Sequence, residues 1–192
     1  MGLLISIEGG DGSGKTVQAE SLNENLAMIR IPCSLHREPG GTKAGEVLRG
    51  IIKDPTYDLC DLSELFAFLS ARSQLVSEVI LPELLEDKIV ILDRFIDSSV
   101  AYQSFGRGLD RAFVENNNYV ATQGLIPDLT FLLDVDPEIG LERGKQRNEA
   151  TCRIEESELS FHKKLRQGYL TIAEENPDRF VIINTNDGQW DK

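Results

Sequence analysis

A glycine-rich segment directly after an apolar run limits what this chain can fold into more than any other feature. Residues 9–16 read Gly-Gly-Asp-Gly-Ser-Gly-Lys-Thr and follow the apolar residues 3–7. This order fits the pattern Gly, four residues, Gly-Lys-Ser/Thr, which in folded proteins joins a strand to a helix. Glycines let the backbone N–H groups wrap an anion, and the following helix adds the positive end of its dipole. The segment therefore predicts a phosphate-binding loop; a flexible glycine-rich turn is the alternative.

A second apolar run ends in a carboxylate that suits the same site. Residues 89–92 are apolar and are followed by Asp93 and Arg94. In a phosphate-loop protein such a carboxylate holds Mg²⁺, directly or through water, beside the hydroxyl of Thr16. Lys15 would reach the terminal phosphates, and the Arg94 guanidinium would point at the same group.

The alternation of apolar runs with helical periodicity predicts the fold class. Four runs resemble buried parallel strands, and a fifth is weaker: residues 3–7, 89–92, 129–135, 180–183 and 34–37. Helical spacing predicts helices between them, at residues 15–28, 42–53, 62–85, 137–147 and 155–175. Pro82 is expected to kink or break the third of these. Strands that alternate with helices imply an α/β fold with a parallel sheet covered on both faces, here in a single domain of residues 1–192.

Composition excludes several classes of partner. The 192 residues carry a formal net charge of −12, so most of the surface would repel a nucleic acid backbone. No apolar run approaches the ~18 residues that span a bilayer, and the N-terminus shows no secretory signal. Cys33, Cys60 and Cys152 are most simply reduced thiols of a cytoplasmic protein, and His36 and His162 are not placed to complete a zinc site. Small phosphorylated molecules are the expected ligands.

Two polar segments are candidates for ligand contacts. Residues 37–42 read Arg-Glu-Pro-Gly-Gly-Thr, in which Arg37 at the carboxyl end of a strand would grip an anion. The alternative is a plain turn with Thr42 as a helix N-cap. Residues 143–153 are polar throughout and contain three arginines: Arg143, Arg147 and Arg153. They indicate a mobile lid over a nucleotide, although a solvated connection would have a similar composition.

Taken together, these segments resemble thymidylate kinase of the bacterial type over essentially the whole chain. The matching segments are residues 8–16, 37–42, 68–72, 93–99, 101–103, 106–108, 127–128 and 143–155. The resemblance implies a three-layer P-loop NTPase fold with a five-stranded parallel sheet and a lid near residues 143–153. It also implies transfer of the γ-phosphoryl group of ATP to dTMP with Mg²⁺, in a cytoplasmic homodimer. The alternatives are another nucleoside monophosphate kinase or a P-loop nucleotide-dependent switch.

The resemblance assigns a role to each matching residue. For dTMP it implies stacking by Phe68, hydrogen bonds to the base from Arg72 and Gln103, and exclusion of a ribose 2′-hydroxyl by Tyr102. Arg37 and Arg94 would hold the acceptor phosphate, Asp11 would contact the acceptor nucleotide, and Ser98 and Ser99 complete the dTMP set. The phosphates of ATP would be bound by Gly9, Gly10, Asp11, Gly12, Ser13, Gly14, Lys15, Thr16, Arg143, Arg147 and Arg153. Thr16 and Asp93 would hold the metal.

The family supplies its transition-state arginine either from the phosphate loop or from the lid. This chain has Gly12 in the loop, so the resemblance implies the lid, with Arg147 at the γ-phosphate and Arg153 on the ATP side. The group expected to be catalytic is Lys15, Asp11, Arg94, Arg147 and Arg153. The chain departs from the family at Val17 and Phe95, and it ends soon after the run at residues 180–183, where the resemblance implies a further helix.

Overall fold

The computed structural model describes residues 2–146 and 158–188 of the chain. Its five strands form one parallel sheet in the order β2-β3-β1-β4-β5. The strands are β1 (Leu3–Glu8), β2 (Cys33–Arg37), β3 (Ile89–Asp93), β4 (Leu129–Asp134) and β5 (Phe180–Asn184). The predicted α/β fold with a five-stranded parallel sheet is confirmed, and each strand begins or ends within a residue of its predicted run.

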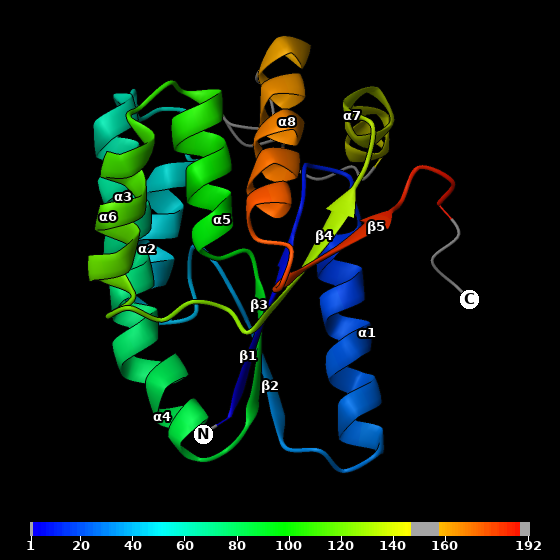
Figure 1. The fold of residues 1–192 in the computed structure, drawn as a ribbon. Helices are drawn as coiled ribbons and strands as arrows, with labels where there is room; N and C mark the ends of the chain where they lie inside the picture. The colour runs from blue at the N-terminus through cyan, green and yellow to red at the C-terminus, as the bar shows by residue number, and fades with distance from the viewer. Residues whose placement is uncertain (1, 147–157, 189–192) are drawn as a thin grey trace.

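Helices cover both faces of this sheet. They are α1 (Lys15–Met28), α2 (Lys43–Lys53), α3 (Asp61–Leu75), α4 (Leu81–Leu85), α5 (Ile96–Ser99), α6 (Arg111–Ala121), α7 (Pro137–Lys145) and α8 (Leu159–Glu175). Two π-helical segments complete the set, η1 (Val76–Ile80) and η2 (Val100–Gly106). Figure 1 shows α1 on one side of the sheet and α8 with the group α2 to α6 on the other.

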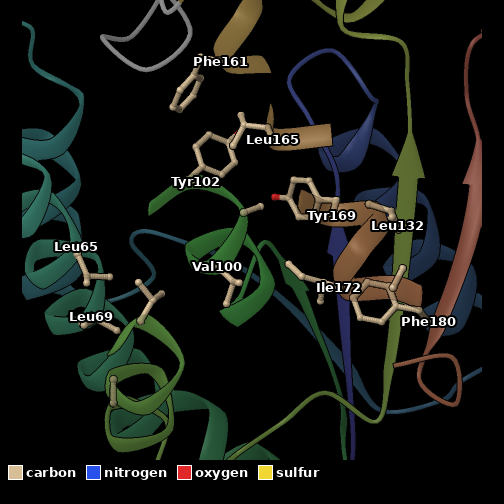
Figure 2. Close-up of a cluster of buried hydrophobic side chains, with 14 of the residues drawn as sticks. Leu65, Leu69, Val100, Tyr102, Leu132, Phe161, Leu165, Tyr169, Ile172 and Phe180 are labelled. Carbon is tan, nitrogen blue, oxygen red and sulfur yellow. The ribbon is translucent and has the colours of Figure 1, made fainter. Parts of the chain in front are cut away.

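Side-chain alternation along the strands builds a core on each face. Ile91 and Leu133 pack with Ala19 on the side of α1, whereas Val90 and Leu92 point to the opposite face. On that second face α8 is the central helix (Figure 2), and its apolar residues are buried against η2, α3 and the strands β4 and β5. The buried side chains shown there include Leu65, Leu69, Val100, Tyr102, Leu132, Phe161, Leu165, Tyr169, Ile172 and Phe180.

Three elements differ from the sequence prediction. Helices α5 and α6 and the segment η2 were not predicted. Pro82 does not break the third predicted helix, since α3, η1 and α4 are continuous and Pro82 lies in the first turn of α4, which follows directly after the π-helical segment η1. The π-helical turn just before it adjusts the backbone.

The continuous helix Asp61–Leu85 is long and apolar enough to cross a membrane by length and composition alone. Its residues Leu65, Leu75 and Ile80 are fully buried in the two cores on one face of the sheet. A core helix of a globular domain passes the same test, and this packing accounts for its apolar composition.

The strand β5 lies at one edge of the sheet and is open on both faces. Its residues Val181, Ile182 and Ile183 are each more than 40% exposed. Residues 185–188 after this strand form no helix, and residues 189–192 lie outside the described residues.

Candidate functional site

The phosphate-binding loop lies between β1 and α1, as the sequence predicts. Gly12 and Gly14 adopt φ of 72° and 91°, a left-handed conformation that favours glycine. A Cβ on Gly12 would also collide with the backbone of Gly140 in α7. The loop therefore needs glycine at position 12 for two reasons, and an arginine could not replace it in this conformation.

Lys15 is buried inside this loop. Its side chain is 7% exposed, and Nζ donates to the carbonyl of Gly10 at 2.7 Å and to Ser13 Oγ at 3.3 Å. Burial, with the neighbouring positive charge of Arg94, lowers the pKa of Lys15 to about 8. The ammonium group faces the cradle formed by the loop and is placed to meet a phosphate.

The two predicted metal ligands lie together. The Thr16 hydroxyl donates to Asp93 Oδ2 at 2.6 Å, because the end of β3 pairs with Ile7 just before the loop. Both groups offer hard oxygen ligands. Within the described residues no group of three His, Cys, Asp or Glu side chains could hold a metal ion alone. This donor set fits Mg²⁺, which keeps several waters and takes one or two protein oxygens plus substrate phosphates.

Arg94 joins the loop to the rest of the site. It adopts a φ of 72°, which is uncommon for a residue with a side chain and typical of functional sites. Its guanidinium donates to Asp11 Oδ1 at 2.9 Å and also reaches the carbonyl of Gly9 and the hydroxyls of Ser98 and Tyr169. Burial alone would raise the pKa of Asp11, but the charges of Arg94 and Lys15 outweigh it and lower that pKa.

Glu8 is a buried acid for which sequence reasoning gave no role. Its Oε1 accepts from the backbone N–H of Phe95 at 2.7 Å, and its Oε2 accepts from Ser98 Oγ at 2.6 Å and from Tyr169 at 3.2 Å. Burial, together with the negative charge of Asp97, raises the pKa of Glu8 to about 7. The sequence signal is a single acidic residue at the end of an otherwise apolar strand.

Arg72, which is predicted to contact the base, makes hydrogen bonds within the protein. The side chain is 1% exposed, and each of its five N–H groups has a protein acceptor. The acceptors are the Glu38 carboxylate (twice), Ser99 Oγ, Asn118 Oδ1 and the carbonyl of Phe95. In this structure Arg72 joins four segments of chain, and a base carbonyl could be bound only if one of these contacts gave way.

The other residues predicted for the acceptor are spread around η2 and α3. Gln103 is buried and donates to Glu64, and Tyr102 lies beneath the Arg94 guanidinium, which is 5.1 Å from its ring centre. Phe68 is half-buried at the edge of the core. Arg37 stands apart from them, because its side chain is 58% exposed and pairs with Glu46 at 3.6 Å.

Only the start of the predicted lid is described. Arg143 is in the last turn of α7 and donates to the backbone carbonyls of Thr185 and Asn186, at 2.9 Å each. Arg147 and Arg153 lie outside the described residues. His162 of α8 is buried, with Nδ1 3.9 Å from Asp11 Oδ2.

The sequence model of the family described as Thymidylate kinase matches residues 7–190. The chain belongs to the thymidylate kinase family. Two curated thymidylate kinases, from Thermoanaerobacter sp. (strain X514) and Lactobacillus acidophilus, are 45% and 46% identical to it. Each alignment covers 95% of this chain, and 89% and 86% of the respective relative.

A solved structure of the same family has the same fold. The crystal structure of thymidylate kinase from Ehrlichia chaffeensis superimposes with a TM-score of 0.81 at 35% sequence identity. The match covers 100% of this chain and 91% of that one. The α/β architecture is thus that of a P-loop NTPase, and the glycine-rich loop, Asp93 and Arg94 occur in a thymidylate kinase framework.

Proposed function

We propose that this protein transfers the γ-phosphoryl group of ATP to dTMP, forming ADP and the dTDP needed for dTTP and DNA synthesis. The observation that carries the proposal is the cluster of Lys15, Asp11 and Arg94. It contains an ammonium group in a phosphate cradle and, at the rim, a guanidinium paired with the Asp11 carboxylate. Membership of the family gives the substrate pair, and the other matched segments surround this cluster.

The residues of the loop would act by charge and position. Lys15 and the loop N–H groups would hold the phosphates of ATP in line with the acceptor. Bound Mg²⁺ would neutralise charge on the β- and γ-phosphates, and Thr16 and Asp93 are the residues that would hold it. Of the lid arginines, we assign Arg147 to the γ-phosphate, Arg153 to the ATP side and Arg143 to support of the lid. An arginine in the first role is worth about 10³–10⁵ in rate.

The acceptor would lie between Arg94 and the η2–α3 side of the site. Arg94 and Arg37 would hold its phosphate, with Asp11, Ser98 and Ser99 shaping that end of the pocket. Phe68, Tyr102 and Gln103 would contact the nucleoside, and Arg72 would act on the base or through Ser99. The acceptor is a phosphate monoester with a second pKa near 6, so it is already mostly dianionic at neutral pH. Transfer therefore needs no general base.

A substrate panel tests this function. ADP formation from ATP and Mg²⁺ is measured with dTMP, dUMP, UMP, CMP, GMP and AMP. We expect strong turnover with dTMP, weaker turnover with dUMP, whose missing methyl group costs about 0.8 kcal/mol of burial, and negligible turnover with the others. A preference for CMP or GMP would indicate another nucleoside monophosphate kinase. ATP hydrolysis that needs no acceptor would indicate a nucleotide-dependent switch.

We also propose that the enzyme is a cytoplasmic homodimer whose ligands are nucleotides, with no nucleic acid or membrane partner. Apolar side chains are exposed on the neighbouring helices α2, α3 and α6, where Phe66 and Phe113 meet edge to face at 6.4 Å. Val47 and Val120 extend this surface and are 66% and 75% exposed. Light scattering should give twice the mass of one chain, and Phe66→Asp should give the mass of a single chain.

A further inference from the structure

The side-chain amide of Gln103 is held in one orientation by a buried acid on α3. Gln103 Nε2 donates to Glu64 Oε1 at 3.1 Å, and both side chains are 1% exposed. Glu64 lies one helical turn before Phe68, so it is on the side of α3 that faces η2. No feature of the sequence singled out Glu64.

A carboxylate accepts hydrogen bonds and donates none, so it fixes which end of the amide faces it. The nitrogen of Gln103 must face Glu64, and the carbonyl oxygen Oε1 must face the opposite way. Within the described part of the chain no group donates a hydrogen bond to Gln103 Oε1. This oxygen is also not among the solvent-inaccessible side-chain atoms that lack a hydrogen-bond partner. The oxygen is therefore open to a ligand.

Arg107 forms an ion pair with this buried acid. Its guanidinium lies 3.5 Å (Nε) and 3.4 Å (Nη2) from the two oxygens of Glu64, and its other face lies over the ring of Phe161 at 4.9 Å. A buried charge is tolerated when it is paired. The second carboxylate beside Arg107, Asp61, is 3.7 Å away and has no contact with Gln103.

We infer that Glu64 is a positioning residue that sets the base selectivity of this site by holding the Gln103 carbonyl oxygen toward the base edge. This rests on the proposed function, in which Gln103 contacts the base. Thymine and uracil present an N–H donor at N3, which a carbonyl oxygen accepts. Cytosine presents a lone pair at N3, which the same oxygen repels.

Glu64→Gln tests the inference because it keeps the shape and lets the amide of Gln103 turn over. The ratio of kcat/KM for dTMP to kcat/KM for dCMP is measured in wild type, in E64Q and in the matched control Asp61→Asn. We expect the ratio to fall at least tenfold in E64Q, chiefly through a higher KM for dTMP, with the KM for ATP unchanged. D61N removes a carboxylate from the same guanidinium and should keep the wild-type ratio.

Two further variants separate the inference from the function on which it rests. Glu64→Ala removes the carboxylate that orients the Gln103 amide and introduces no larger side chain. If E64Q folds poorly, E64A should show the same fall in the ratio of kcat/KM for dTMP to kcat/KM for dCMP. Gln103→Leu tests whether Gln103 contacts the base at all. If Q103L lowers the ratio and both Glu64 variants keep it, the inference is overturned and the proposed function stands. If wild type does not phosphorylate dTMP, or if Q103L keeps the ratio, the proposed function or its Gln103 contact fails, and the inference fails with it.

Discussion

Lys15 gives a prediction at the scale of a single residue. Burial and Arg94 lower its pKa to about 8 in the free protein, and bound phosphates must raise it again because they favour the ammonium form. Binding of Mg·ATP should therefore take up a proton above pH 8 and almost none at pH 6.5. At pH 8.5 we expect an uptake of roughly 0.7–0.8 proton per site. Calorimetric titrations in two buffers of different ionisation enthalpy measure this number, and zero uptake at pH 8.5 would contradict it.

The positions of single residues could be predicted where a motif defines them. Contacts between residues that are far apart in the sequence could not. Lys15, Thr16, Asp93 and Arg94 meet as expected, since the loop and the ends of adjacent parallel strands fix their positions. The saturated contacts of Arg72 could not be predicted, because Glu38 and Asn118 come from segments far away in the sequence.

At the scale of elements, Arg72 holds α3 to its surroundings. It pairs with the buried carboxylate of Glu38 before α2 and with Asn118 of α6. Arg72→Ala would leave Glu38 buried and unpaired, so we expect a loss of about 3–5 kcal/mol in the free energy of unfolding. Burial already raises the pKa of Glu38 despite Arg72. The loss should therefore be larger at pH 8 than at pH 5, where the unpaired acid takes up a proton.

Urea unfolding of R72A at both pH values checks this expectation. The double variant Arg72→Met/Glu38→Leu removes both charges and should recover much of the lost stability. A stable R72A protein that has lost only its affinity for dTMP would instead support the direct contact between Arg72 and the base.

The elements themselves were predictable where apolar periodicity is uninterrupted. All five strands, helices α1 and α2, and the continuous helix formed by α3, η1 and α4 agree with their predicted ranges to within one residue at each boundary. Helix α6 was missed although Asp110 caps it by accepting from the N–H of Phe113. Its apolar residues Phe113 and Val120 face outward, so its pattern does not resemble a core-facing helix.

At the scale of the whole molecule, the exposed edge of the sheet at β5 is the part most prone to associate with another chain. Val181 and Ile183 on one face of β5 and Ile182 on the other are all exposed, next to a row of backbone groups that β4 leaves free. Such an edge can pair with another chain. Figure 1 shows β5 at the edge of the sheet, next to β4.

Replacing Val181 and Ile183 with threonine should therefore reduce association and leave folding unchanged. Threonine keeps the β-branch that suits a strand and removes apolar surface. Since the replaced side chains face solvent in the described structure, the free energy of unfolding should change by no more than about 0.5 kcal/mol. Light scattering during slow heating should show a later onset of aggregation than in wild type. A loss of more than about 1 kcal/mol would contradict the open edge, because it would mean that these two side chains are covered in the folded protein.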